Sequence, residues 1–187
     1  QHARAVGIET PETWFPQFPN EVARTVREVG GLVVAKPRSQ LCASSGAKAM
    51  LINSAVTQRG DVYDRLSKHF GLSNAFTKRF PEKAMPMLQR YYPESMKEIY
   101  SLSGFRDMSG SHVVMQGALK ILQQPRHLGI GLCFEEAEVI PDIAQQTIRL
   151  CERIGYYGAF ELEFIVAQGR MLLIDFNGRF YNQLAFD

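Results

Sequence analysis

The sequence predicts an α+β protein of two lobes. Its predicted elements follow the order helix, strand, loop, strand, helix and strand, then further strands, a long helix and a hairpin. Because strands and helices do not alternate strictly, a doubly wound parallel sheet is not indicated. The last two apolar runs are separated by Gln168-Gly169, a dipeptide typical of a β-hairpin turn. The chain is therefore expected to end in an antiparallel ribbon.

The first half of the chain is expected to hold two amphipathic helices and several short strands. Asn20 can cap a helix whose apolar residues keep helical spacing and which ends at Gly30-Gly31. Apolar residues at i, i+4 and i+8 predict a second helix, from Asp61 to Phe70. The predicted strands are Leu32–Pro37, Ala49–Ile52 and Ala84–Tyr92.

The second half is expected to be mostly sheet around one long helix. Lys97–Phe105 and Ser111–Met115 resemble strands that flank a turn, whereas residues 117–124 fit a helix and a strand equally well. Pro141 can occupy the first position of a helix, which Gly155 would end. The predicted buried residues of this helix are Ile143, Ile148, Cys151 and Ile154.

The two arms of the final hairpin carry charged and amide side chains where buried strands usually have none. Glu161 and Glu163 share one face of the first arm, because side chains in a strand alternate between faces. By the same rule, Asp175, Asn177 and Arg179 share one face of the second arm. These faces coincide if the loop has an odd number of residues or the ribbon contains a bulge. Clustered carboxylates would then favour Mg²⁺; the alternative is an ordinary face that meets solvent.

The composition of the chain argues against several classes of protein. The chain has 187 residues and a formal net charge of +2, too small to indicate nucleic-acid binding through bulk electrostatics. Cys42, Cys133 and Cys151 are odd in number and have no CxxC spacing, which argues against disulfides and a zinc site and favours a reducing, cytoplasmic setting. No run of about 18 apolar residues is present, so no membrane span is predicted. Since the sequence does not begin with Met, we expect a piece of a longer protein.

Four features of the chain together carry a family resemblance. They are Lys36 at the end of a predicted strand, the small-residue loop after it, the strand Gln89-Arg-Tyr-Tyr92, and the ending Glu163…Asp175-Phe-Asn177-Gly-Arg179. In these features the chain resembles the ATP-grasp superfamily, which includes biotin carboxylase, carbamoyl-phosphate synthase and D-alanine–D-alanine ligase. The segment Phe180–Asp187 looks most like a bacterial branch related to carbamoyl-phosphate synthase. The resemblance implies two α+β lobes with antiparallel sheets that clamp ATP.

The resemblance also implies a set of nucleotide-binding residues. Those on the phosphate side would be Lys36, Ser44, Ser45 and Gly46. A lysine at a strand end is a flexible point charge, and a loop of small residues can close over phosphates with its backbone N–H groups. Those on the adenine side would be Gln89, Arg90 and Tyr92. The alternatives are a lysine that extends to water and a loop that is a plain connector.

Metal-binding and catalytic roles come from the same resemblance. Glu163 and Asp175 would hold Mg²⁺, or Mn²⁺ in its place, and Asn177 would complete the shell of a second ion. Arg179 would face the transferred γ-phosphate or the acyl phosphate, unless it pairs structurally with Asp175. Lys120 looks like a basic residue on the substrate side. Asp175 stands where glutamate is usual in the family, which shortens one ligand by a methylene.

The chain is expected to comprise three segments. Residues 1–19 would lead in from a missing N-terminal domain, 20–90 would form the small ATP-grasp lobe, and 91–187 would form the large lobe with the metal-binding hairpin. The loop after Lys36 has a single glycine, Gly46, whereas many relatives have a longer glycine-rich loop.

The implied activity is that of an ATP-dependent carboxylate–amine ligase. MgATP would phosphorylate a small-molecule carboxylate, and an amine or another nucleophile would attack the acyl phosphate. The alternatives are a non-catalytic MgATP-binding sensor or assembly module and a purely structural α+β domain. The expected partners are the small-molecule substrates, the rest of the same polypeptide and a second copy in a homodimer. Neither nucleic acid nor a membrane is expected as a partner.

Overall fold

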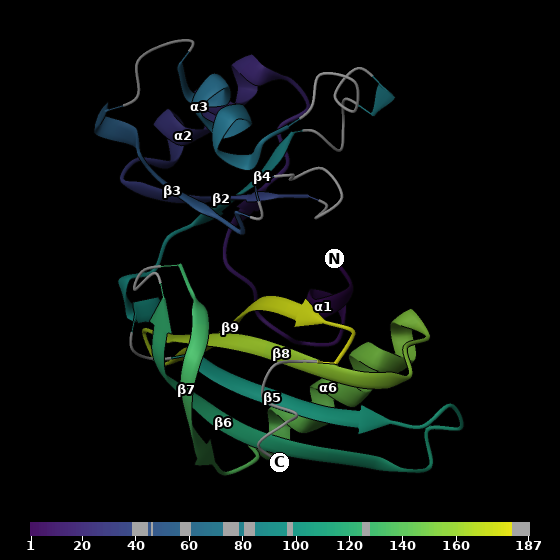
Figure 1. The fold of residues 1–187 in the computed structure, drawn as a ribbon. Helices are drawn as coiled ribbons and strands as arrows, with labels where there is room; N and C mark the ends of the chain where they lie inside the picture. Colours follow the sequence, from purple (N-terminus) through teal and green to yellow (C-terminus); the bar gives the residue numbers. More distant parts are fainter. Residues whose placement is uncertain are drawn as a thin grey trace. The chain divides into compact units, whose positions relative to one another are not determined.

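The computed structural model consists of two compact units, each with its own sheet (Figure 1). It describes residues 1–38, 45, 47–56, 61–72, 79–80, 85–96, 99–124 and 128–180. Unit 1 comprises Gln1–Pro11 and Tyr92–Asp187, and unit 2 comprises Glu12–Tyr91. In the part of the chain so described, no helix is long and apolar enough to cross a membrane.

In the part of unit 2 that the structure describes, a four-stranded antiparallel sheet is accompanied by two helices. The strand order is β1-β4-β2-β3, with β1 at Thr13–Trp14, β4 at Pro86–Arg90, β2 at Leu32–Pro37 and β3 at Met50–Asn53. The helices are α2, Pro19–Val29, and α3, Asp61–Phe70, and a short 3₁₀ turn, η2, covers Ser54–Val56. All three strand pairings are antiparallel, as the sequence predicts.

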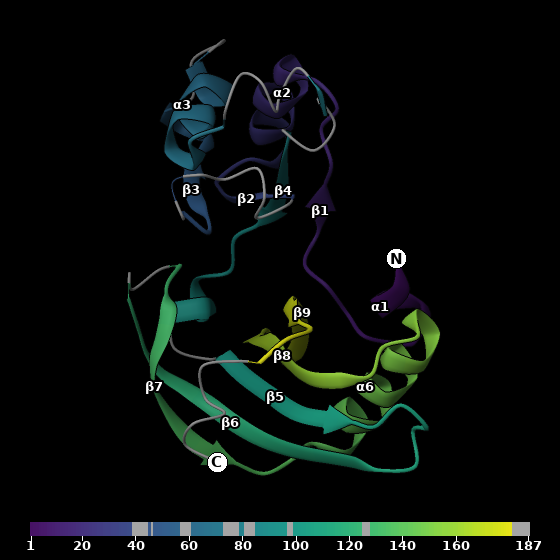
Figure 2. The ribbon, with the colours of Figure 1, turned by 45° about the vertical axis from the view of Figure 1, so that its right-hand side comes forward.

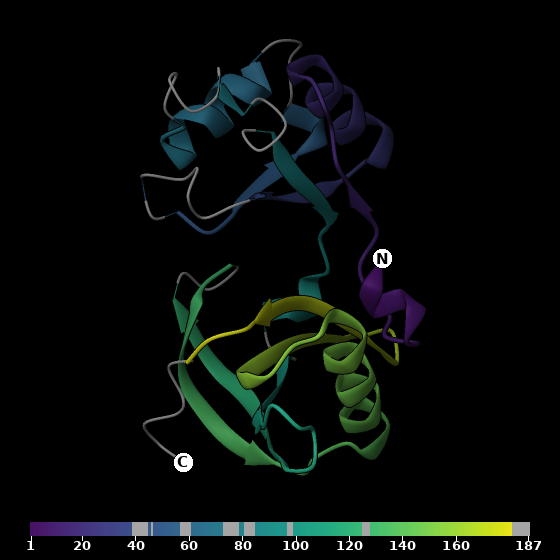
Figure 3. The same ribbon diagram turned by 90° about the vertical axis from the view of Figure 1, so that its right-hand side faces the viewer.

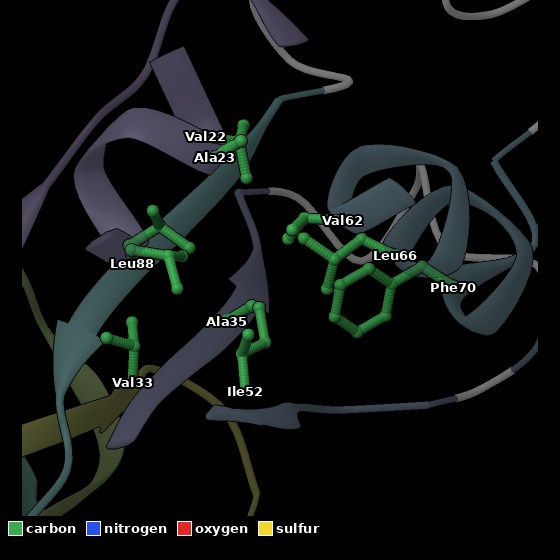
Figure 4. Close-up of a cluster of buried hydrophobic side chains, with 10 residues drawn as sticks. Val22, Ala23, Val33, Ala35, Ile52, Val62, Leu66, Phe70 and Leu88 are labelled. Carbon is green, nitrogen blue, oxygen red and sulfur yellow. The ribbon is translucent and has the colours of Figure 1, made fainter. Parts of the chain in front are cut away.

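The core of unit 2 forms because both helices turn one apolar stripe toward the sheet. Figure 4 shows the side chains of α2 and α3 meeting those of β2, β3 and β4. The members of this cluster are Val22, Ala23, Val26, Val33, Ala35, Ile52, Val62, Leu66, Phe70 and Leu88. Burial of a side chain such as Phe70 or Leu66 stabilises the fold by about 1.5–3 kcal/mol.

Unit 1 is a five-stranded antiparallel sheet with a long helix along one face (Figures 2 and 3). The strand order is β7-β6-β5-β8-β9, with β7 at Ile130–Ala137, β6 at Val113–Gln124, β5 at Ile99–Arg106, β8 at Gly158–Ala167 and β9 at Arg170–Asn177. The helices are α6, Pro141–Ile154, and α1, His2–Ala5, together with the 3₁₀ turn η3, Pro93–Met96. Ile143 and Leu150 of α6 pack against Leu102 and Leu162 of the sheet, so this face is apolar.

The final hairpin has a two-residue turn and a bulge. Gln168 and Gly169 have φ values of 53° and 72°, as a two-residue turn matching the strand twist requires. Such a loop alone would leave the acidic residues of the two arms on opposite faces. The register shifts between Glu163 and Phe164, where Ile174 is the extra residue. The bulge therefore places Asp175 directly opposite Glu163, and Asn177 opposite Glu161.

Several local predictions need correction. Helix α2 begins at Pro19 with Phe18 before it, because a proline suits the first helical position better than the interior, so Asn20 is not the cap. Of the residues predicted to be buried in α6, Ile154 is 40% exposed and Ile148 is only half-buried. The helix buries Thr147 and Leu150 instead. The ambiguous residues 117–124 belong to the strand β6, and β7 was not predicted.

Candidate functional site

The face of the unit 1 sheet opposite α6 carries polar side chains that are nevertheless buried. Ser101 and Ser103 alternate along β5 with the core residues of the other face, and Glu161 does so along β8. These three residues are at most 7% exposed. Since burying polar groups is unfavourable unless they are hydrogen-bonded, this face must contain an internal network.

Glu161 lies at the centre of that network. Its Oε1 accepts a hydrogen bond from Ser101 Oγ at 2.9 Å, and its Oε2 accepts one from Asn177 Nδ2 at 3.2 Å. Burial and the nearby negative charge of Glu163 raise the pKa of the Glu161 carboxyl, while the hydrogen bonds from Ser101 and Asn177 and the charge of Lys120 act against that rise. The carboxylate is therefore held by specific donors from β5 and β9.

Glu163 is paired with a buried lysine. Lys120 Nζ on β6 donates to Glu163 Oε1, and the two side chains are only 3% and 17% exposed. The predicted substrate-side lysine and a predicted metal ligand are thus brought into direct contact. The pairing offsets the cost of burying either charge alone.

Asp175, Asn177 and Arg179 continue the polar face on and after β9. Asp175 is exposed and lies directly opposite Glu163 in the register. Asn177 Oδ1 accepts a hydrogen bond from Arg179 Nη2 at 3.1 Å, and Arg179 Nη1 donates to the carbonyl of Phe180. In the described ranges of the chain, Arg179 forms no ion pair with Asp175, so that structural alternative is not what the structure shows.

The oxygen donors on this face are of the kind that Mg²⁺ prefers. Among residues that the structure describes, no group of three or more His, Cys, Asp or Glu side chains is arranged to hold a metal alone. The pair Glu163 and Asp175, with the amide oxygen of Asn177 nearby on the same face, supplies hard oxygen ligands. Proteins commonly bind Mg²⁺ through one or two carboxylates and leave the other positions to phosphates and water.

The predicted nucleotide residues of unit 2 lie on its two central strands. Lys36 is half-buried on β2 and pairs in register with Met87 of β4. Further along β4, buried Gln89 donates to Thr13 Oγ1 at 3.3 Å, and Arg90 forms an ion pair with Glu12 at 2.6 Å. The side chains of Gln89 and Arg90 are therefore held by partners within unit 2.

The remaining predicted residues are placed as follows. The backbone N–H of Ser45 donates to the carbonyl of Phe70 at 3.3 Å, whereas Ser44 and Gly46 lie outside the described residues. Tyr92 belongs to unit 1, where its side chain is buried in a small cluster with Ile165, Ala167 and Leu172. Because the side chain of Tyr92 is packed there, only its backbone groups remain for the predicted contact with adenine.

Sequence reasoning missed the contribution of Ser101. Ser101 and Ser103 flank Leu102 in a segment that begins with the apolar residues Ile99 and Tyr100. This alternation of polar and apolar residues is the signal of a strand with one polar face. That Ser101 reaches Glu161 follows only from the pairing of β5 with β8, which no local pattern reveals.

Comparison with known proteins identifies the fold. No family model and no curated protein matches the chain. Among solved structures, biotin carboxylase from Campylobacter jejuni in a β,γ-ATP complex has a TM-score of 0.70 at 16% sequence identity, covering 99% of this chain and 40% of that one. The ADP complex of purK, an N5-carboxyaminoimidazole ribonucleotide synthetase, has a TM-score of 0.67 at 14% identity, covering 97% and 43%.

A third similar structure is named for the fold itself. The ATP-grasp ligase PsnB, solved with its precursor peptide PsnA2 and AMPPNP, has a TM-score of 0.57 at 13% identity, covering 97% of this chain and 49% of that one. The chain thus spans about two-fifths to one-half of the structures it matches. The agreement extends over nearly all of the present sequence, through both sheets. The chain has the ATP-grasp fold.

Proposed function

We propose that this chain is the ATP-binding part of an ATP-dependent carboxylate ligase. The observation that carries the proposal is the β9 bulge, which sets Asp175 opposite Glu163 on the polar face of a sheet with this fold. Carboxylates directly opposite each other repel; Lys120 compensates the charge of Glu163, and a nucleotide-bound divalent ion is the further cation that this donor set suits.

We propose the following nucleotide contacts. Lys36 binds the α- or β-phosphate, and the loop containing Ser44, Ser45 and Gly46 covers the phosphates with backbone N–H groups. Gln89, Arg90 and Tyr92 contact the adenine, with Arg90 and Tyr92 using backbone groups. The side-chain anchoring of Arg90 to Glu12 and of Tyr92 in its apolar cluster supports such backbone roles.

The proposed metal ligands are Glu163, Asp175 and Asn177, with Mg²⁺ as the ion and Mn²⁺ as its substitute. Bound there, the ion would neutralise charge on the β- and γ-phosphates. Arg179 stabilises charge on the transferred phosphoryl group, and its hydrogen bond to Asn177, another residue of the proposed site, supports this role. Lys120 holds Glu163 and provides the positive charge on the substrate side.

The proposed reaction has two steps. A substrate carboxylate oxygen attacks the γ-phosphorus and ADP leaves, giving an acyl phosphate. An amine or another nucleophile then attacks the acyl carbon and inorganic phosphate leaves. Alignment and charge stabilisation supply most of the rate acceleration in such transfers, so the fixed polar face is what the protein contributes.

We further propose that unit 2 is the small lobe, expected at residues 20–90, and that unit 1 is the large lobe, expected at 91–187. Residues 1–19, expected to be an entry segment, are divided between the two units, with 1–11 in unit 1 and 12–19 in unit 2. The rest of the polypeptide and the two small-molecule substrates are its partners, in a reducing, cytoplasmic setting and with a homodimer as the assembly. The partial coverage of the similar structures supports a longer protein.

The decisive experiment is the Asp175→Asn variant. Loss of one charged contact to a transferring phosphoryl group usually lowers the rate by about 10²–10³-fold, so we expect Mg²⁺-dependent ATP turnover to fall by at least that much. Steady-state ADP release measures it. Asp142→Asn, which changes an exposed carboxyl in the first turn of α6, is the matched control. Equal turnover in Asp175→Asn and in the control would refute the proposed role.

A second candidate function is a MgATP-binding module without chemistry. The observation that favours it is the Lys120–Glu163 ion pair, because one candidate metal ligand already has a buried cationic partner. Calorimetry with MgATP, combined with ATP hydrolysis assays across a panel of carboxylates and amines, separates the two functions. Binding without hydrolysis under every condition would support the module.

A further inference from the structure

Glu161 stands out because its carboxylate connects three parts of the unit 1 sheet. It lies on β8, is 7% exposed, and accepts hydrogen bonds from Ser101 of β5 and Asn177 of β9. Asn177 in turn accepts a hydrogen bond from Arg179. The four side chains therefore form one continuous chain of hydrogen bonds from the centre of the sheet to the segment after its last strand.

The direction of these hydrogen bonds fixes the orientation of the Asn177 amide. A carboxylate only accepts, so the group of Asn177 that faces Glu161 must be its NH₂. The amide oxygen then points the other way, where it accepts from Arg179. Rotation of the amide by a half-turn would put two acceptor oxygens against each other and would turn the NH₂ group toward a guanidinium.

We propose that Glu161 is a positioning residue that keeps the oxygen of the Asn177 amide, and with it Arg179, turned toward the nucleotide-bound metal. This inference rests on the proposed function. Glu161 itself does not act on the reactants; its role is to prevent the amide from presenting a donor where an acceptor is needed. Groups that orient a metal ligand from behind commonly change metal affinity or activity by about 10–100-fold when mutated.

The chain offers two pairs of variants that isolate this role. In Glu161→Gln, the new side chain keeps an acceptor oxygen for Asn177 and offers an NH₂ group to the Ser101 hydroxyl. Glu161→Ala leaves both Ser101 and Asn177 without this hydrogen-bond partner. Ser101→Ala removes a donor to Glu161. Ser103→Ala is its matched control, since Ser103 is equally buried on the same face of β5 but contacts the carbonyl of Gln116.

The first measurement needs no nucleotide. The side-chain amide of Asn177 gives a pair of NMR signals, assigned by their loss in Asn177→Asp. We expect these signals to be shifted from the free-amide position and slow to exchange in the wild type, in Glu161→Gln and in Ser103→Ala. They should move toward the free-amide position and exchange faster in Glu161→Ala and Ser101→Ala. Unchanged signals in both of the latter variants would overturn the proposal.

The second measurement uses the Mg²⁺ dependence of ATP turnover in the same variants. Glu161→Ala is expected to lower kcat and to raise the Mg²⁺ concentration for half-maximal turnover, each by about 10–100-fold, with a smaller change in the KM for ATP. Glu161→Gln should stay within about threefold of the wild type, because a role in orientation does not need the charge. If Glu161→Gln is as defective as Glu161→Ala, Glu161 acts through its charge and the positioning role is refuted.

The two measurements separate this inference from the function on which it rests. If the wild type shows no ATP turnover or binding, the proposed function is wrong, while the amide signals still report whether Glu161 orients Asn177. If the wild type turns over ATP and Glu161→Ala alters the amide signals without changing kcat or the Mg²⁺ dependence, the function stands and the positioning role falls. Ser101→Ala keeps this test valid should Glu161→Ala fail to fold.

Discussion

At the scale of single residues, the Lys120–Glu163 ion pair belongs to the candidate site and is also expected to stabilise the fold. Removing one partner of a buried ion pair leaves the other charge without compensation, which typically costs about 3–5 kcal/mol. We expect Lys120→Met to lower the free energy of unfolding by about 3 kcal/mol, since Glu163 keeps some access to solvent. Urea denaturation followed by circular dichroism measures this change.

The double variant Lys120→Met/Glu163→Gln is the informative control for that prediction. Because it removes both charges, it should recover a good part of the stability lost in Lys120→Met. Lys48→Met, at an exposed position, should change stability by no more than about 0.5 kcal/mol. Equal stability of Lys120→Met and the wild type would show that the pair is not stabilising.

The residues of the candidate site were predictable in part. The acids of the hairpin interrupt apolar strands, and the sequence-based prediction that a bulge or an odd loop would unite their faces is confirmed by the pairing of Glu163 with Asp175. Their partners Lys120 and Ser101 come from β6 and β5. Such contacts depend on strand order in the sheet, which local periodicity does not contain.

At the scale of elements, the turn of the β8–β9 hairpin carries a residue in an unusual conformation. Gln168 has a φ of 53°, a left-handed value that asparagine adopts more readily than glutamine. Asn-Gly is also the dipeptide that two-residue turns of this type prefer. We expect Gln168→Asn to raise the free energy of unfolding by about 0.5 kcal/mol, measured by urea denaturation.

Two companion variants test the cause of that effect. Gly169→Ala should destabilise the protein by about 1 kcal/mol, because Gly169 has a φ of 72° that a β-carbon disfavours. Gln116→Asn, at an exposed position in the interior of β6, should show no gain. A stability of Gln168→Asn below that of the wild type would contradict the turn argument.

Helices whose apolar residues recur regularly along one face were predicted well, and strands without regular alternation were not. The predicted helix from Asp61 to Phe70 is confirmed because its apolar residues keep one unbroken stripe. Strand β7 has glycine, cysteine and adjacent glutamates instead of an alternating pattern, and it pairs with β6 through two register shifts. Its existence depends on a neighbouring strand more than on its own residues.

At the scale of the whole molecule, ligand binding should stabilise the fold. A ligand at 100 times its Kd stabilises a protein by about 2.7 kcal/mol, which raises Tm by roughly 5–10 °C for a chain of this size. We expect millimolar MgATP to produce such a shift in a thermal denaturation scan. ATP with EDTA, or MgATP with Asp175→Asn, should give a clearly smaller shift. No shift with MgATP in the wild type would rule out nucleotide binding as the role of the acids.

The two units are interleaved along the chain, and this has a consequence for biosynthesis. Glu9 accepts a hydrogen bond from the backbone N–H of Leu173 and pairs with Arg170, which is 161 residues away in sequence. A ribosome therefore releases the whole of Glu12–Tyr91 before the strand that receives Glu9 has been translated. The sheet of unit 2 can close early from contiguous residues, whereas residues 1–11 can complete their contacts in unit 1 only after β9 has been translated.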